Sequence, residues 1–231
     1  MESNPHRAIQ SYVTAQELTS AFAPHPWPGL VLAFCRIKAE NIGRMTFAQR
    51  GSGLLLRLFG WRCVFVPPPV PKGIIVVYPH TSNWDFIIGI LYRIATGFQV
   101  RWLGKDAIFR WPVRRLLLRL GGIPVNRRDP SGFVDTLLAE FARSESLWLG
   151  LAPEGTRART DHWKSGFYRI ALAGGLSVGL GYIDYATKTV GIDTYVSLTG
   201  DPTQDFAHIQ ASYAGKRGLR PENEGGIRLR P

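Results

Sequence analysis

The fold is decided by the stretch Tyr78-Pro79-His80-Thr81-Ser82-Asn83-Trp84-Asp85. Residues 74–77, all β-branched, lead into it and have the composition of a buried strand, and residues 86–92 lead away from it as an amphipathic helix. His80 is therefore expected at the C-terminal end of a strand. Ligands of open α/β sheets bind at that edge, so His80 lies in a predicted crevice with a carboxylate, Asp85, five residues downstream. The pair is a candidate general base and the group that orients it.

A second interpretation of the same residues requires no chemistry. Ser82 is followed three positions later by Asp85, which matches a capping box. In that motif the serine caps a helix and the acid accepts from the backbone N–H of the capping residue. On this interpretation Asp85 is only a helix cap and His80 is a loop residue without a task. The stretch by itself leaves both interpretations open.

Length and net charge limit the number of domains and the classes of partner. At 231 residues and 45% hydrophobic, the chain can bury one sizeable core, which indicates a single domain. The formal net charge of +11 implies attraction to an anionic partner. Nucleic acid, an anionic membrane surface and a phosphorylated substrate all fit that charge.

The cysteines and the apolar runs indicate a compartment. Cys35 and Cys63 give neither a framework of disulfides nor a metal-ligand spacing, which favours a reducing cytoplasm. No segment reaches the roughly 18 apolar residues that a membrane-spanning helix needs. Residues 1–25 lack an apolar core after a basic start, so we expect no secretory signal.

The chain divides into three regions. Residues 1–45 are weakly patterned and are expected to be a weakly ordered N-terminal extension. The α/β pattern begins just after Met45, the only methionine besides Met1, so both positions are compatible with the start of translation. We assign residues 46–214 to the folded domain. Residues 215–231, rich in glycine and arginine, are expected to form a basic, flexible tail.

Two segments combine apolar and basic residues. Residues 52–61 predict a short helix with almost no polar face, which fits either the core or a lipid interface in which Leu55, Phe59 and Trp61 insert. Pro112 begins another helix. Its apolar and basic sides consist of Val113, Leu116, Leu117 and Leu120, and of Arg114, Arg115 and Arg119. A solvated basic face and contact with anionic headgroups both explain this pattern.

Strands alternate with helices along the chain. Beyond the first strand and helix, strands are expected at 100–103, 123–125, 147–152, 177–183 and 190–197, and helices at 133–143, 163–173 and 202–213. This alternation predicts the α/β class, as one domain with a mixed, mainly parallel sheet flanked by helices. Residues 97–105 do not match a phosphate-binding loop, because Asp106 replaces the Ser or Thr that holds magnesium.

Polar clusters follow three of the predicted strands. They are His80 with Asp85, then Arg127, and then Glu154-Gly155-Thr156-Arg157. Arginines at strand ends suit a phosphate, because the planar guanidinium donates in a bidentate fork. Gly155 allows close approach of backbone to a ligand, although a simple turn also explains it.

These clusters resemble a known family, the glycerophospholipid acyltransferases, over roughly residues 72–196. Residues 80–85 look like its His-x4-Asp signature, Gly122-Ile123-Pro124-Val125-Asn126-Arg127 resembles its second block, and Pro153-Glu154-Gly155-Thr156-Arg157 is its third block in full. The first block alone is weak evidence. Together with the third, in this order and spacing, it is strong, and the helix cap no longer suffices to explain Asp85.

The resemblance implies an O-acyltransferase that moves a fatty acyl group from a thioester carrier, coenzyme A or acyl carrier protein, to a hydroxyl of a lysolipid. His80 would act as general base and Asp85 would orient it. The substrate-binding residues would be Arg127 and Arg157 for the phosphate, Glu154 for an acceptor hydroxyl or an arginine, Gly155 and Thr156 in the same block, and Lys105 as a weaker candidate for phosphate. No cofactor or metal ion is expected.

Departures from the family pattern concern the acceptor. Asn126 stands where the family often carries an acid, Leu151 and Ala152 replace its usual aromatic residue, and residues 177–182 lack its usual proline. The first choice of acceptor is 1-acyl-glycerol-3-phosphate, and a lyso-aminolipid stays open. A nucleic-acid partner is not expected, since no reading motif is present. We expect a peripheral protein on an anionic membrane at its cytoplasmic face.

Overall fold

The computed structural model describes residues 45–125 and 130–229. The predicted N-terminal extension lies outside the described residues, apart from Met45. The helices are α2 (Phe47–Leu58), α3 (Trp84–Thr96), η2 (Asp106–Ile108), α4 (Arg114–Arg119), α5 (Pro130–Arg143), α6 (Gly166–Gly174), α7 (Pro202–Tyr213) and η3 (Pro221–Asn223). The strands are β1 (Arg62–Phe65), β2 (Lys72–Val77), β3 (Val100–Lys105), β4 (Gly122–Val125), β5 (Leu147–Leu151), β6 (Ser177–Asp184) and β7 (Thr189–Ser197).

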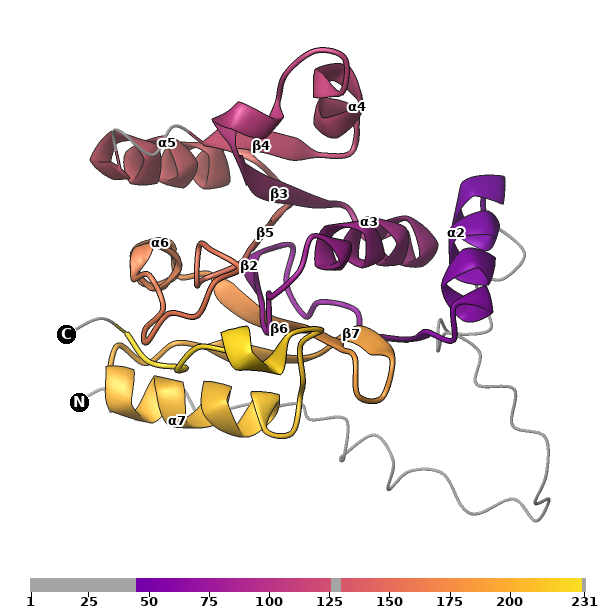
Figure 1. Cartoon of the computed structure of the whole chain (residues 1–231). Coiled ribbons are helices and arrows are strands. Elements are labelled where there is room, and N and C mark those ends of the chain that lie inside the picture. Colours follow the sequence, from indigo (N-terminus) through magenta and orange to yellow (C-terminus); the bar gives the residue numbers. More distant parts are fainter. Residues whose placement is uncertain (1–44, 126–129, 230–231) are drawn as a thin grey trace, which may run out of the picture.

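In the described part of the chain the strands form one seven-stranded sheet in the order β1-β7-β6-β2-β5-β3-β4. Strands β6 and β7 pair antiparallel, and the other neighbours pair parallel. Helices flank the sheet (Figure 1). The predicted α/β class with a mixed, mainly parallel sheet is confirmed. Strand β2 lies between β6 and β5, in the middle of the sheet. The loop that follows β2 therefore begins at the centre of the edge formed by the C-terminal ends of the parallel strands.

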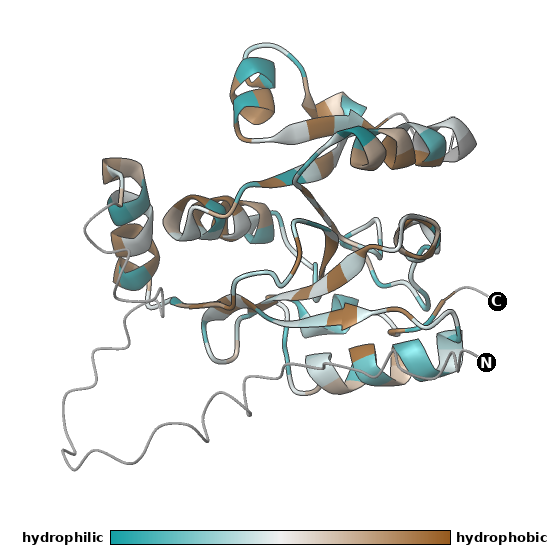
Figure 2. Cartoon of the chain, turned by 180° about the vertical axis from the view of Figure 1, so that it is seen from behind, coloured by the Kyte–Doolittle hydropathy of each residue, from teal (hydrophilic) through white to brown (hydrophobic). Residues whose placement is uncertain are grey.

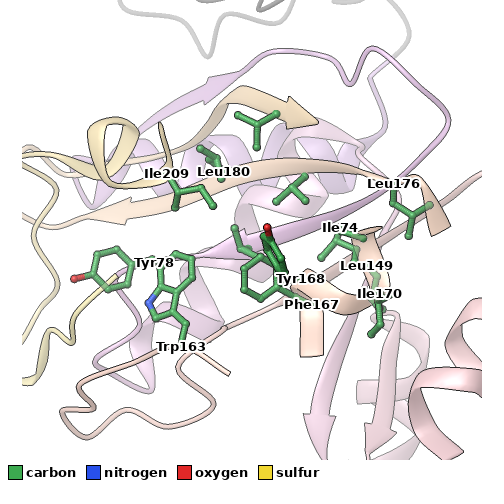
Figure 3. Close-up of a cluster of buried hydrophobic side chains, with 14 of the residues drawn as sticks. Ile74, Tyr78, Leu149, Trp163, Phe167, Tyr168, Ile170, Leu176, Leu180 and Ile209 are labelled. Atoms are coloured by element: carbon green, nitrogen blue, oxygen red, sulfur yellow. The ribbon is translucent and has the colours of Figure 1, made fainter. Parts of the chain in front are cut away.

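The two faces of the sheet carry separate cores, because successive side chains of a strand point to opposite faces. Ile74 and Val76 of β2 pack in a core with residues of α5, α6 and α7, whereas Ile75 packs in a second core with residues of α2 and α3. Figure 3 shows the first of these, with the ring of Trp163 between Tyr78 and Phe167. Ile74 (0% exposed) is buried in the first core and Ile75 (3% exposed) in the second, so β2 is covered on both faces of the sheet.

Helix α2 begins earlier than predicted and ends earlier. Thr46 and Gln49 form a capping box, in which Gln49 N–H donates to Thr46 Oγ1 (3.2 Å) and Thr46 N–H donates to Gln49 Oε1 (2.7 Å). The helix stops at Leu58. Trp61 then turns into the core, 8% exposed, so the expectation that Trp61 inserts into a lipid interface is wrong.

Helix α4 has only six residues and packs less than its pattern predicts. Two residues of its predicted apolar side, Val113 just before the helix (46% exposed) and Leu116 (57% exposed), lie in solvent. No residue of this helix is buried. Among the described residues, no helix is long and apolar enough to cross a membrane.

Residues 215–229 differ from the flexible tail that their composition predicts. Arg220 N–H donates to Thr81 Oγ1 (3.2 Å), on the loop after β2, and Leu229 forms a β-bridge with Trp163. Within the segment, Glu224 accepts from Gly218 N–H (2.7 Å) and pairs with Arg217 (3.0 Å). These long-range hydrogen bonds fix the segment, and composition carries no signal for them.

Candidate active site

The loops after β2 and β5 meet because the two strands are parallel neighbours. Val76 lies opposite Leu151 in the ladder, so both strands end at the same edge of the sheet. His80 follows β2 and Glu154 follows β5. The backbone N–H of His80 donates to Glu154 Oε2 at 3.2 Å. Two of the predicted polar clusters are thus in direct contact.

The His80 side chain is paired with Asp85. His80 Nδ1 lies 3.1 Å from Asp85 Oδ2, with the imidazole 19% exposed and the carboxylate 1% exposed. An ionised carboxylate only accepts hydrogen bonds, so Nδ1 carries the hydrogen and Nε2 is left as the basic nitrogen. The arrangement matches a base whose tautomer is fixed by its neighbour.

Asp85 also accepts from the backbone of the loop that carries His80. Its Oδ2 accepts from Thr81 N–H and Ser82 N–H, each at 2.8 Å. Asp85 is the second residue of α3, where a side chain can reach back over the start of the helix. The acid thus accepts from the amide of Ser82, as the capping-box interpretation predicted, but the residue that precedes α3 is Asn83, and its side chain does not cap the helix. The same carboxylate contacts His80.

The ionised form of Asp85 is favoured. Burial by itself raises the pKa of this carboxyl, but hydrogen bonds from His80, Tyr185 and Ser82 outweigh burial and hold the pKa below its ordinary value. The Tyr185 hydroxyl donates to Oδ1 at 2.7 Å. Asp85 thus stays charged at neutral pH beside His80.

Glu154 occupies a different environment. It is 2% exposed, and its oxygens accept from two backbone amides, those of His80 and of Gly225 (3.3 Å). Burial raises the pKa of Glu154 to about 7, against the lowering effect of these hydrogen bonds. Sequence reasoning assigned Glu154 to an acceptor hydroxyl or an arginine. In the structure it fixes the loop of His80 to the C-terminal segment.

Three of the other predicted substrate-binding residues, Gly155, Thr156 and Arg157, continue the loop that carries Glu154. Gly155 has φ +66°, and a Cβ there would lie 2.8 Å from Lys164 Nζ. Thr156 and Arg157 follow in the same loop and are exposed. Lys105 is exposed at the end of β3, on the same edge as β5, but within the described ranges no hydrogen bond or ion pair joins it to His80 or Glu154. Arg127 lies outside the described residues.

The C-terminal segment is part of the site, which sequence reasoning missed. Gly225 C=O accepts from the Tyr78 hydroxyl (2.9 Å), while Gly225 N–H donates to Glu154. A Cβ at Gly225 would meet the carbonyl oxygen of Thr160 and lie 3.1 Å from Glu154 Oε1, so only glycine fits so close to the loop. Gly225 itself is the only sign of this contact in the sequence. Its partners, Glu154 and Tyr78, lie about 70 and 150 positions away, so the sequence does not indicate which residues it approaches.

The arrangement supplies a buried charge, Asp85, beside the partly exposed imidazole of His80. Such a set can accept a proton from a bound hydroxyl group. In residues 45–125 and 130–229, no cluster of His, Cys, Asp or Glu has the make-up of a metal site.

Comparison with known proteins extends these observations. The model of a protein family described as Acyltransferase matches residues 66–183, slightly more than half of the chain. The structure is similar to the crystal structure of the 1-acyl-sn-glycerophosphate (LPA) acyltransferase PlsC from Thermotoga maritima, with a TM-score of 0.49 and 16% identity over 71% of this chain and 74% of that chain. Among curated proteins no significant match is found. The matched range includes His80, Asp85 and Glu154.

Replacement of Glu154 should change the pH dependence of stability. Its folded-state pKa of about 7 lies above the ordinary value of 4.5, so its contribution to folding is fully present at low pH and is lost as pH rises through about 7. Glu154→Gln has no such group. The unfolding midpoint of the wild type should therefore fall relative to that of Glu154→Gln between about pH 5 and about pH 8.

The matched control is Glu145→Gln, at an exposed glutamate between α5 and β5. Its unfolding midpoint should follow that of the wild type across the same pH range. Parallel pH profiles for the wild type and Glu154→Gln would contradict the raised pKa of Glu154.

Proposed function

This chain belongs to the acyltransferase family, and on that premise we propose that it transfers a fatty acyl group from a thioester carrier to a hydroxyl of a lysolipid. The observation that carries the proposal is the contact between His80 Nδ1 and Asp85 Oδ2 (3.1 Å) at the sheet edge, within the family-matched range. The proposed acceptor is 1-acyl-glycerol-3-phosphate, with a lyso-aminolipid as the alternative. The proposed donor is acyl-coenzyme A or acyl carrier protein.

In the proposed mechanism His80 acts as general base. Its Nε2 takes the proton of the acceptor hydroxyl while the hydroxyl oxygen attacks the thioester carbonyl carbon. When the tetrahedral intermediate collapses, the carbon–sulfur bond breaks and the thiolate takes the proton back from the imidazolium. The charge on Asp85 stabilises that imidazolium. The acyl group passes directly to the alcohol, so no serine or cysteine nucleophile is needed.

The acceptor's phosphate requires cations near His80. Arg157 is three residues after Glu154, whose side chain holds the His80 loop, and it is exposed to a bound ligand. Lys105 is on the same edge of the sheet. We propose Arg157 as a phosphate ligand together with Arg127, with Gly155 and Thr156 shaping the loop and Lys105 as an additional cation.

An anionic phospholipid surface is the proposed docking partner, because the acceptor is a membrane lipid. Exposed apolar side chains gather on three elements. They are Phe47, Leu54, Leu55, Leu58 and Phe59 in and just after α2, Trp84 and Ile87 in α3, and Ile108, Trp111, Val113, Leu116 and Leu118 in and before α4. Figure 2 shows hydrophobic and hydrophilic residues side by side on α2 and α4, both at the periphery of the molecule.

The position of Trp84 near His80 and the arginines among the exposed apolar side chains also favour lipid as the partner of this surface. Trp84, 61% exposed, comes four residues after His80, so an apolar surface adjoins the proposed catalytic residue. Arg50 and Arg57 of α2 and the arginines of α4 accompany the apolar side chains, and a mixture of the two kinds suits an anionic interface.

His80→Ala should abolish acyl transfer without unfolding the protein. General-base help contributes about 10²–10⁴-fold to a rate, and the side chain removed is partly exposed, so the core is not disturbed. The measurement is kcat with one long-chain acyl-coenzyme A and several lysolipids, with product read by mass. The control is His208→Ala, at an exposed histidine of α7. A variant that keeps more than about a tenth of the wild-type rate contradicts the assignment.

Arg157→Ala should raise KM for lysophosphatidate more than KM for monoacylglycerol, which lacks the phosphate. A hydrogen bond to a charged group contributes about 1.5–3 kcal/mol, so KM for the charged acceptor should rise about tenfold or more. Arg143→Ala, at an arginine 75% exposed in the last turn of α5, is the control. Equal losses with both acceptors would exclude a phosphate contact and favour a structural role for Arg157.

Flotation with liposomes tests the docking surface. Vesicles with anionic phosphatidylglycerol should bind the protein more strongly than neutral vesicles, and high salt should weaken binding, because each arginine near anionic headgroups contributes about 1 kcal/mol. An Arg114, Arg115, Arg119 triple alanine variant should lose the salt-sensitive part. A Leu58→Ser, Phe59→Ser variant should lose the salt-resistant part.

The control for docking is Leu172→Ser, at a leucine 39% exposed on α6, whose core lies on the other face of the sheet from α2. It should bind vesicles like the wild type. Binding that ignores salt, lipid charge and all of these residues would reject the docking surface, and so would self-association through α2 in place of vesicle binding.

A further inference from the structure

The two oxygens of the Asp85 carboxylate have different partners. Oδ2 accepts from Thr81 N–H and Ser82 N–H and lies against His80 Nδ1, all within the loop after β2. Oδ1 accepts from the Tyr185 hydroxyl at 2.7 Å, across 100 positions of sequence. We propose that Tyr185 is a positioning residue for the proposed catalytic pair, holding Asp85 so that its other oxygen stays aligned with His80.

Tyr185 is itself firmly placed. It is the first residue after β6, and its backbone N–H donates to Arg217 C=O at 2.8 Å. The Trp61 ring meets its ring edge-on, with centroids 5.0 Å apart and an interplanar angle of 86°. The adjacent Asp184 accepts from the amides of Ala186 and Arg217, each at 3.1 Å. Segments from the beginning and the end of the described chain therefore fix the hydroxyl group in one place.

The effect on the pair follows from geometry. A carboxylate held through one oxygen can turn about its Cβ–Cγ bond, whereas one held through both cannot without breaking a hydrogen bond. A fixed Oδ2 keeps the hydrogen on His80 Nδ1 and leaves Nε2 to accept a proton. Among the described residues, the Tyr185 hydroxyl donates to Asp85, so it acts on His80 through that residue.

Tyr185 remains a donor at every working pH. Burial, the hydrogen bond to Asp85 and the charge of Asp85 all raise the pKa of its hydroxyl far above the ordinary range. The residue also lies beyond the family-matched range 66–183, so the match does not account for it.

The chain offers a matched hydrogen bond without a catalytic partner. The Tyr168 hydroxyl donates to Asp205 Oδ2 at 2.7 Å, and Asp205 also accepts from Thr199 and Gly200, which lie just before α7. Tyr168→Phe and Tyr185→Phe each delete one tyrosine–aspartate hydrogen bond. Both should lower the unfolding midpoint similarly, and only the second should disturb His80.

The experiment compares these two variants with the wild type. Tyr185→Phe should lower kcat by about tenfold, part of the roughly 10²–10⁴-fold effect of a positioned base, while KM for donor and acceptor stays unchanged. Tyr168→Phe should leave kcat unchanged. Equal losses of kcat in both variants, or a kcat for Tyr185→Phe within about twofold of wild type, would overturn the assignment.

The inference rests on the proposed function, so a second measurement separates the two. The ¹⁵N shifts of the His80 imidazole in the wild type should show hydrogen on Nδ1 and none on Nε2. In Tyr185→Phe the two shifts should move toward each other, and in Tyr168→Phe they should not. If the wild type acylates no lysolipid, the proposed function fails, but the ¹⁵N shifts still test the positioning role. Unchanged shifts in Tyr185→Phe would overturn that role.

Discussion

The site depends on one buried negative charge, the carboxylate of Asp85, which has to be surrounded by hydrogen-bond donors. Without compensating hydrogen bonds, removing such a group from water costs several kcal/mol. Asp85 meets the requirement with amides of its own loop, the His80 ring and the Tyr185 hydroxyl. The loop after β2 therefore has little freedom to adopt another shape, and the orientation of His80 follows from it.

Two carboxylates within one site are driven to opposite behaviour by their surroundings. Side-chain donors hold the pKa of Asp85 below its ordinary value. Glu154 is equally buried, but only backbone amides reach it, and burial prevails, so that its pKa rises to about 7. Asp85 is thus ionised beside His80 at neutral pH, whereas Glu154 is present in both its charged and its neutral form near neutral pH.

Local patterns were enough to predict most of the fold. The β-branched run before His80 predicts β2, and the alternation of strands and helices predicts the mixed, mainly parallel sheet. The adjacency of β2 and β5 was not predictable in this way, because strand order depends on contacts between distant segments. The pairing of His80 with Asp85 was also predictable, because one loop and one helix turn connect them. Trp61, Tyr185 and Gly225 were not, since each owes its position to residues tens to more than a hundred positions away. Composition suggested a lipid-facing tryptophan and a loose tail, and packing reversed both.

The hydrogen bonds from residues 220 and 225 to the loops that carry His80 and Glu154 bear on how the protein is made. A ribosome adds about 5–20 residues per second, so Glu154 is synthesised several seconds before Gly225. During that interval the nascent chain carries His80, Asp85 and Glu154 without the amides of Arg220 and Gly225. Translation of this segment therefore sets the moment at which the two loops acquire the hydrogen bonds from Arg220 and Gly225.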